Sequence, residues 1–340
     1  MGKGFLLALL AALFYAINIP LSALLLGNGE IAPLTMAGLL YIGAGIGIAL
    51  LSAFRRKGNV PNPLAREDLP GVIGMVLLDI IAPILLMLGL FCGNPANASL
   101  LGNFEIVATS LIAAFFFHEK IGKSLWAGIA LVTLASMVIS FEGGASLRFT
   151  PGSLFVLAAA TCWGLENNCT RIISSKNAFE IVTIKGLCSG TGALLIAFCH
   201  GDSLPSLPAV FCALGLGFVS YGLSITLYVQ AQNRLGAART SACYAINPFI
   251  GAALGFALCR LAIPRMEFLA GTLIMLIGSV FVAFDTLCVR HAHPHEHVFT
   301  EWQEGVLTTR TIVHCHPHIH WLSSHGPHTH HHPRAFSMKG

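Results

Sequence analysis

Residues 70–91 read Pro-Gly-Val-Ile-Gly-Met-Val-Leu-Leu-Asp-Ile-Ile-Ala-Pro-Ile-Leu-Leu-Met-Leu-Gly-Leu-Phe, with Asp79 as their one charged residue. A helix of about 20 residues crosses the hydrocarbon core of a bilayer, and this run has that length. Backbone groups that face lipid need hydrogen-bond partners within their own segment, so the span must be helical. The stretch therefore predicts a transmembrane helix with one acidic group inside it.

Similar apolar runs follow one another through most of the 340-residue chain, in which 55% of the residues are hydrophobic and only 10% are charged. No soluble core needs so many runs of this length, so we predict an all-α integral membrane protein. The loops between the runs are short, which makes consecutive spans antiparallel neighbours. The sequence predicts ten transmembrane helices, at about 4–26, 31–54, 70–91, 97–117, 124–141, 153–173, 179–199, 207–230, 238–259 and 266–285.

The placement of positive charge predicts the orientation of these spans. If the N-terminus is cytoplasmic, twelve Lys and Arg residues lie in inner segments, and three, Arg148, Arg260 and Arg265, lie in outer loops. Cytoplasmic loops carry the excess of Lys and Arg in membrane proteins. We therefore expect a multi-pass protein of the cytoplasmic (plasma) membrane with both termini in the cytoplasm.

The sequence lacks the motifs of several other classes of protein. The ten cysteines are scattered, without the spacing of a disulfide framework or a zinc site. No Gly-rich nucleotide loop and no His-Glu-x-x-His motif is present. We therefore expect no enzyme, no required cofactor and no nucleic-acid partner.

The pattern of the first five spans recurs in the last five. Residues 10–18 read Leu-Ala-Ala-Leu-Phe-Tyr-Ala-Ile-Asn, and residues 157–166 read Leu-Ala-Ala-Ala-Thr-Cys-Trp-Gly-Leu-Glu. A shift of 148 places Tyr15 on Trp163, and a shift of 142 places Glu105 on Asn247. Because five is odd, the second unit inserts upside down relative to the first. Inverted repeats of this kind are a common construction of secondary transporters.

The two units resemble the EamA repeats of the drug/metabolite transporter superfamily. The resemblance rests on Leu-Ala-Ala-x-x-Tyr/Trp in the first helix of each unit, on an Ala/Ser-rich fourth helix, and on the ending Ala-Ala-Phe-Phe-Phe-His-Glu-Lys at 113–120. The second unit departs from this pattern, because residues 260–264 read Arg-Leu-Ala-Ile-Pro where the family often repeats the Glu. The resemblance implies a ten-helix secondary carrier for small metabolites, amino acids or toxic compounds. We accordingly predict a first repeat at 1–143, a second repeat at 150–286 and a His-rich cytoplasmic tail at 287–340.

Polar residues recur at similar depths in several spans. Ionisable side chains at membrane depth are energetically costly and are functional candidates by default. Burial favours the protonated form of a carboxyl group, so proton flux through such a group could drive substrate movement. We predict a substrate cavity lined by Asn18, Asp79, Glu105, Glu166 and Asn247, with aromatic walls from Tyr15, Trp163 and Tyr244.

A second interpretation of these residues is structural. Asn side chains can hold membrane helices together by hydrogen bonds, and Glu166 can form a buried ion pair with Lys185. The aromatic residues can pack against lipid or neighbouring helices without touching a substrate. The sequence leaves both interpretations open.

The composition changes abruptly after Arg290, where thirteen of the fifteen histidines lie. In an extended chain alternate residues share one side, and the segment 306–313 between two histidine runs has the composition of a strand. Gln303-Glu-Gly305 could turn the chain and bring the two runs together as a hairpin. Imidazole clusters bind transition metals, so we predict that Zn or Ni binds at His291, His293, His295, His297, His314, His316, His318 and His320.

The leading functional hypothesis is a secondary carrier that exports a small organic metabolite, such as an amino acid or a drug-like compound, with proton coupling. Its partners would be that solute and membrane lipid, and a homodimer stays open. One alternative is a transition-metal exporter that collects its ion with the tail, although no histidine lies within the predicted spans. The other alternative is a metal-responsive membrane receptor.

Overall fold

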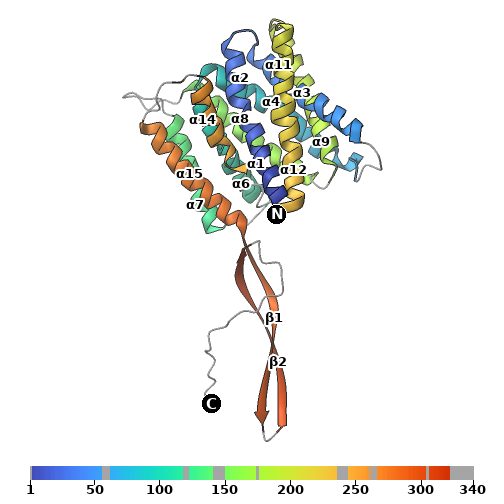
Figure 1. Ribbon diagram of the computed structural model, residues 1–340, viewed down its shortest axis with the longest axis vertical. Coiled ribbons are helices and arrows are strands. Elements are labelled where there is room, and N and C mark those ends of the chain that lie inside the picture. The colour runs from blue at the N-terminus through green and yellow to red at the C-terminus, as the bar shows by residue number, and fades with distance from the viewer. Residues whose placement is uncertain are drawn as a thin grey trace. The chain divides into compact units, whose positions relative to one another are not determined.

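The computed structural model describes residues 2–55, 62–117, 122–140, 150–173, 176–235, 244–259, 261, 266–303 and 306–321. The chain divides into two compact units, Met1–Ala283 and Phe284–Gly340. The first unit is a bundle of helices, and the second contains a two-stranded sheet (Figure 1).

The helices up to residue 140 correspond to the first predicted repeat. Two of its membrane segments, α1–α2 and α5–α6, are built from two helices each, which meet at a short irregularity. The elements are α1 (Gly2–Ala16), α2 (Asn18–Gly27), α3 (Pro33–Arg55), the 3₁₀ helix η1 (Arg66–Asp68), α4 (Leu69–Cys92), α5 (Pro95–Leu101), α6 (Phe104–Phe117) and α7 (Lys123–Ser140).

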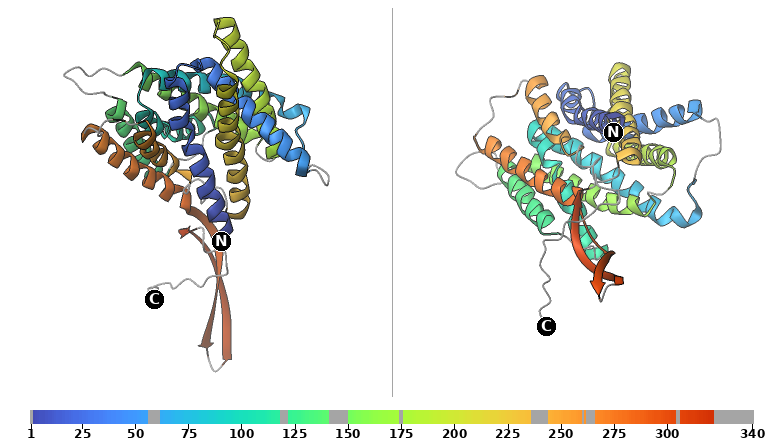
Figure 2. Two further views of the ribbon diagram at one scale, coloured as in Figure 1. Left: turned by 45° about the horizontal axis from the view of Figure 1, so that its top comes forward. Right: turned by 60° about the horizontal axis from the view of Figure 1, so that its bottom comes forward.

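The helices from residue 151 onward include two turns of π-helix, each inserted between α-helices. α1 lies beside α12, and the blue and yellow ribbons show this in both views of Figure 2. The elements are α8 (Pro151–Ile172), α9 (Ala178–Ile184), η2 (Lys185–Ser189), α10 (Gly190–His200), α11 (Leu207–Gly217), η3 (Phe218–Leu223), α12 (Ser224–Leu235), α14 (Asn247–Leu258) and α15 (Met266–Leu287).

Among the described residues, eight helical segments are long and apolar enough to cross a membrane. The other two predicted spans correspond to α8 and α14. α14 has only 12 residues, and α8 carries the consecutive polar residues Glu166, Asn167 and Asn168 in its last two turns. The count of ten spans therefore stays a prediction, while the prediction of a helical membrane bundle is confirmed.

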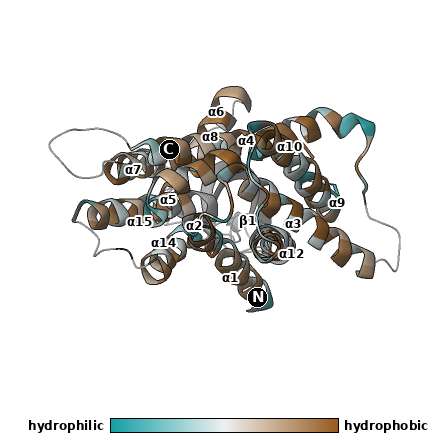
Figure 3. Cartoon of the chain, turned by 90° about the horizontal axis from the view of Figure 1, so that it is seen from above, coloured by the Kyte–Doolittle hydropathy of each residue, from teal (hydrophilic) through white to brown (hydrophobic). Residues whose placement is uncertain are grey.

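The surface of the bundle has the apolar character that lipid requires. Large side chains such as Phe54, Phe198 and Phe211 are exposed, and hydrophobic residues follow one another along most helices in Figure 3. A soluble protein rarely exposes contiguous apolar surface of this extent. The exposed rings are therefore the side of the bundle that faces the hydrocarbon chains.

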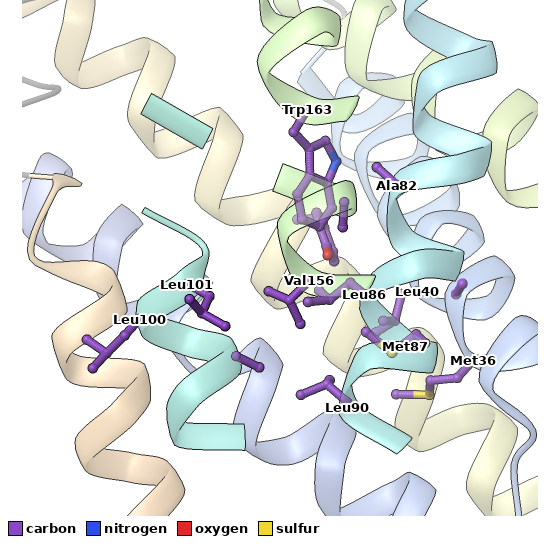
Figure 4. Packing of buried hydrophobic residues seen from close by; sticks show 14 of the residues in the cluster. Met36, Leu40, Ala82, Leu86, Met87, Leu90, Leu100, Leu101, Val156 and Trp163 are labelled. Atoms are coloured by element: carbon purple, nitrogen blue, oxygen red, sulfur yellow. The ribbon is translucent and has the colours of Figure 1, made fainter. Parts of the chain in front are cut away.

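The interior is packed by residues of α3, α4, α5 and α8. Figure 4 shows Leu40 of α3, Met87 of α4 and Val156 of α8 meeting beneath the ring of Trp163. Protein interiors are packed as densely as organic crystals, which leaves little freedom for these side chains. This packed layer supports the polar groups that lie beside Trp163.

Two glycine contacts bring α3 against α11 with no side chain between them. A Cβ atom at Gly43 would lie 2.1 Å from the carbonyl oxygen of Leu214, and one at Gly217 would lie 2.0 Å from that of Leu40. Small residues allow membrane helices to approach this closely. The two helices are thus held at backbone contact distance, directly before η3.

Helix irregularities gather at similar positions along several segments. The chain breaks its helical pattern at Ile17 between α1 and α2, and at Gly102 and Asn103 between α5 and α6. π-helical turns interrupt α9–α10 at η2 and α11–α12 at η3. Interruptions of this kind often mark functional sites, and discontinuous membrane helices surround the binding sites of many transporters.

The second unit contains the strands β1 (Cys288–Gln303) and β2 (Val306–Trp321), which pair in an antiparallel sheet. The pairing register places His291 opposite His318, His293 opposite His316 and His295 opposite His314. The backbone hairpin expected from the sequence is therefore present. The proposed turn residues 304–305 and the last histidines, 325–332, lie outside the described residues.

Candidate functional site

An ion-pair cluster lies where α4, α8 and η2 meet. Lys185, the first residue of η2, places its Nζ atom 3.0 Å from Oδ2 of Asp79 and 3.1 Å from Oε1 of Glu166. Both carboxylates are almost fully buried, with side-chain exposures of 0% and 2%. One ammonium group therefore joins two carboxylates from two different helices, and we call these three residues the ion-pair cluster.

Hydrogen bonds extend the ion-pair cluster to α3 and along α8. The hydroxyl of Tyr41 donates to Oδ1 of Asp79 at 3.0 Å, and the indole N–H of Trp163 donates to the Tyr41 oxygen at 3.3 Å. Thr170 donates to the Glu166 carboxylate one turn further along α8. The cluster is thus fixed from four elements by charged and neutral partners.

The ion-pair cluster answers one question that the sequence left open. The predicted pair of Glu166 with Lys185 is confirmed, and Asp79 joins it as a second partner. Removing one member of a buried ion pair leaves an uncompensated charge, which destabilises a protein strongly. The cluster consequently has a structural role, whatever else it does.

Glu105 has a different environment, although it is also an acidic residue inside a span. It lies in the first turn of α6, directly after the break at Gly102 and Asn103. Its Oε1 atom accepts a hydrogen bond of 2.6 Å from Nδ2 of Asn167. A carboxylate in the first turn of a helix is favoured by the helix dipole. The helix dipole and the Asn167 hydrogen bond thus both favour the charged form of Glu105.

The surroundings of Glu105 place it toward the middle of the bundle. It is half-buried, and among the described side chains no cation lies within ion-pair distance of it. Glu105 interacts electrostatically with Glu166 and Lys185, and also with Tyr15 and Tyr244. These residues come from helices of both halves of the chain, so Glu105 faces the centre and not the lipid.

All five tyrosines of the chain form one connected tyrosine cluster. It consists of Tyr15, Tyr41, Tyr221, Tyr228 and Tyr244. The ring centroids are 5.0 Å apart from Tyr41 to Tyr221, 5.7 Å from Tyr221 to Tyr15, 5.7 Å from Tyr15 to Tyr244 and 5.0 Å from Tyr244 to Tyr228. The separations suit edge-to-face aromatic contacts. Because Tyr41 also bonds Asp79, the tyrosine cluster begins where the ion-pair cluster ends.

The two predicted asparagines differ in their contacts. Nδ2 of Asn18 donates to the hydroxyl of Tyr221 at 3.0 Å, and its Oδ1 atom accepts from Ser22 at 3.2 Å. Asn18 is therefore a support of the tyrosine cluster. Asn247 begins α14 and is half-buried, but no side-chain hydrogen bond of Asn247 is found within the described residues.

The sequence missed several residues that the structure places at the site. Tyr41 and Tyr221 lie in long apolar spans, where a tyrosine can face either lipid or the interior. Asn167 follows Glu166 directly and projects toward another helix, a direction that spacing alone does not reveal. Lys185 was expected only as a pairing partner, and it turns out to be the centre of the ion-pair cluster.

Polar contacts hold α9–α10 at both ends, to α3 at one end and to the segment that leads into α4 at the other. At one end, the Thr35 hydroxyl donates to Asp202 at 3.0 Å. At the other end, Glu180 accepts from the backbone N–H of Leu64 at 3.0 Å, and Lys176 pairs with Asp68 at 3.1 Å. In this arrangement, the segment containing Lys185 is fixed on both sides of the site.

An apolar groove of about 490 Å³ lies between α3, α11 and η3. It is lined by residues such as Ile46, Phe54, Phe211 and Phe218, and it contains none of the predicted cavity residues. The polar centre is thus separate from the groove.

Among the described residues, no group of three or more His, Cys, Asp or Glu side chains has the arrangement of a metal site.

Comparison with known proteins identifies the family. The sequence pattern of the EamA-like transporter family matches residues 2–141 and 150–284. The chain belongs to the EamA-like transporter family. The resemblance noted from the sequence is therefore confirmed, and the chain is a multi-pass membrane protein of a transporter family.

Two relatives of this EamA-like protein carry transporter names. An uncharacterized transporter of Methanothermobacter thermautotrophicus is 28% identical over 301 residues, which cover 83% of this chain and 86% of the relative. A probable terminal-alkyne amino-acid exporter of Streptantibioticus cattleyicolor is 27% identical over 223 residues, which cover 63% of this chain and 73% of the relative.

A solved crystal structure shares the fold of this EamA-like protein. It superposes with a TM-score of 0.60 at 16% sequence identity, covering 83% of this chain and 96% of the other. The metal-exporter alternative gains no support from the family match or from these named relatives. The family and the two named relatives carry transporter or exporter names.

Proposed function

We propose that this EamA-like protein is a secondary carrier that exports a small organic metabolite, an amino acid or a drug-like compound, in exchange for protons. The observation that carries the proposal is Glu105, a half-buried carboxylate that accepts a hydrogen bond from Asn167 and has no cation within ion-pair distance among the described side chains. Ionisable residues at membrane depth commonly mark substrate and proton pathways. The exporter name of one relative supports the direction of transport.

Helix packing supports two inverted five-helix repeats within ten spans. The second and seventh predicted spans pack together as α3 and α9–α10, and the fourth and ninth pack together as α5 and α14. The first span contacts the eighth as α1 and α12, and the sixth contacts the third as α8 and α4. Exchanging the halves turns each of the first two contacts into itself and turns the last two into each other. A pseudo-twofold axis in the membrane plane has this consequence.

Proton coupling is proposed for Glu105 and not for the ion-pair cluster. Asp79 and Glu166 are both bound to Lys185, so protonating either would disrupt a buried ion pair. Protonating Glu105 leaves Asn167 with a hydrogen-bond acceptor on the same carboxyl group. Glu105 can therefore change its proton occupancy with the smaller disturbance of the surrounding structure.

The remaining parts of the proposal concern the place and partners of the carrier. We place it in the cytoplasmic membrane with both termini in the cytoplasm, on the distribution of Lys and Arg between inner and outer segments. A homodimer would use lipid-facing helix surfaces, and glycine-rich faces allow such contact.

Metal binding by the tail is a separate part of the proposal. The backbone register of β1 and β2 supports Zn or Ni binding, because it sets three pairs of histidine positions opposite one another. Imidazole is a preferred ligand of both metals. Truncation after Thr286 tests this part alone, since it should remove metal binding and leave solute transport intact.

The transport proposal is tested with the purified full-length chain in proteoliposomes. Vesicles with an acidic lumen are offered a panel of labelled amino acids, amines and nucleosides in neutral buffer. At least one solute should accumulate above the level in protein-free vesicles, and a protonophore should abolish that accumulation. Glu105→Gln should abolish coupling, while the matched variant Glu267→Gln, at an exposed residue of α15, should keep it.

Two results would contradict this function. Absence of flux for every solute in the panel, with well-folded protein in the vesicles, would favour the receptor alternative. Accumulation of Zn²⁺ or Ni²⁺ that depends on residues 287–340, without movement of any organic solute, would favour the metal exporter.

A further inference from the structure

The described side chains inside the bundle have an unequal charge balance. Three carboxylates, Asp79, Glu105 and Glu166, face the centre, and Lys185 is the single ammonium group among the described interior residues. Lys185 is bound to two of the carboxylates at 3.0 and 3.1 Å. The described centre therefore has no cation left over for a substrate, and it has one carboxylate that no cation satisfies.

This charge balance favours a positively charged substrate group over a negatively charged one. A bound carboxylic acid or the carboxylate of an amino acid would need a positive partner, and near the described centre it would meet the negative charge of Glu105. A bound ammonium group would instead find Glu105, whose orientation Asn167 fixes through a 2.6 Å hydrogen bond. Charge-assisted hydrogen bonds to a carboxylate are among the strong polar interactions in proteins. The described part of the centre is thus complementary to a cation.

The tyrosine cluster supplies the second half of such a site. Tyr15 and Tyr244 are neighbours of each other at 5.7 Å and are both electrostatic neighbours of Glu105. Tyrosine rings attract ammonium groups through their faces and offer an apolar body for a carbon skeleton. They carry no charge that would favour an acidic substrate.

We propose that the substrate is an organic amine in its ammonium form, with the cation at Glu105 and the carbon skeleton against Tyr15 and Tyr244. This inference rests on the proposed carrier function and narrows its substrate class. The inference predicts that a monocationic amine binds more tightly than the amino acid that has the same side chain.

The test uses matched sets of ligands with the purified full-length protein in detergent. Each set contains an amine, the corresponding amino acid and the corresponding carboxylic acid, with an isobutyl, a phenyl or an indole body. In at least one set the amine should bind at least tenfold more tightly than the other two compounds, as measured by titration calorimetry. Glu105→Gln should weaken amine binding at least tenfold, and Glu105→Asp should retain part of it.

Controls separate the substrate class from folding and from the carrier function. Glu267→Gln should bind the amine within twofold of the wild type, and each variant must elute as a single species with a cooperative thermal transition. If no set favours the amine, or if Glu105→Gln binds it normally, the inference is wrong. If amino acids then still move in proteoliposomes, the carrier function stands without it, and if no solute moves, the proposed function fails as well.

Discussion

The ion-pair cluster and the Glu105 region use the same chemistry in opposite ways. Asp79 and Glu166 are buried, are paired with Lys185 and are fixed by the hydroxyls of Tyr41 and Thr170. Glu105 is half-buried and is held by one amide, that of Asn167, at 2.6 Å. A group whose interactions are all satisfied inside the protein stabilises a particular arrangement of helices. A group with unused capacity can exchange a proton or bind a ligand.

The helix that joins the two regions explains how they stay connected. Three consecutive residues of α8 contact different partners: Glu166 binds Lys185, Asn167 binds Glu105, and Asn168 donates to the backbone oxygen of Thr109 at 3.3 Å. A change of ligand or proton at Glu105 therefore acts on the same helix turn that holds the ion-pair cluster. Removal of single groups from each region tests this difference.

The largest expected loss of stability comes from removing the cation of the ion-pair cluster. Lys185→Met leaves Asp79 and Glu166 buried without their partner, which should lower the free energy of unfolding by about 3–5 kcal/mol. Thermal unfolding of the purified protein in detergent measures the effect. The triple variant Lys185→Met, Asp79→Asn, Glu166→Gln should recover much of the loss because it removes both uncompensated charges. A single variant that unfolds like the wild type would show that the cluster is not formed.

A smaller loss is expected from the hydrogen bonds of Tyr41. Tyr41→Phe removes a donor to the Asp79 carboxylate, and hydrogen bonds to charged groups contribute about 1.5–3 kcal/mol. Tyr244→Phe, in the same tyrosine cluster, removes only a 3.3 Å contact between two hydroxyls, Tyr244 and Ser224, and should lose about 0.5–1.5 kcal/mol. Equal losses for the two variants would remove the energetic distinction between the regions.

The pair of Lys176 with Asp68 at the end of the bundle makes a third comparison. It has nearly the same N–O distance as the buried pairs, 3.1 Å, but the Lys176 side chain is 20% exposed. Lys176→Met should therefore destabilise the protein less than Tyr41→Phe, because water and salt screen such pairs. The difference from the wild type should shrink further in high salt, as unfolding curves at two salt concentrations would reveal. A salt-independent loss as large as that of Lys185→Met would contradict this explanation.

The smallest effect on stability is expected at Glu105. Glu105→Gln keeps the Oε1 acceptor for Asn167 and removes no ion pair, so the free energy of unfolding should change by about 0.5 kcal/mol or less. Transport in proteoliposomes should nevertheless be lost. Strong destabilisation by this variant would show that Glu105 belongs to the structural group and not to the exchanging one.

The helical membrane bundle was predictable because the length and apolarity of the runs leave few alternatives. The acidic candidates were also predictable, since a carboxylate such as Asp79 is conspicuous among apolar residues. The different roles of these acidic residues were not predictable, because they depend on which faces of α4, α6 and α8 turn toward Lys185. Tyr41 and Tyr221 went unnoticed because a tyrosine in an apolar span is as compatible with lipid contact as with the interior.

The number of spans and the metal site of the tail stay predictions. The ten-span count depends on α8 and α14, one of them too polar at its end and the other too short within its described residues. The histidine side chains of the tail lie outside the described side chains, so the metal site stays a prediction based on backbone register and composition.

The difference between the two regions is tested most directly by chemical labelling in the membrane. A hydrophobic carbodiimide reacts with accessible protonated carboxyl groups, and mass spectrometry of the digested protein locates the adducts. Glu105 should be modified, and Asp79 and Glu166 should remain unmodified in the same sample. Modification of Asp79 or Glu166 with Glu105 intact would contradict the assignment of Glu105 as the exchanging carboxylate.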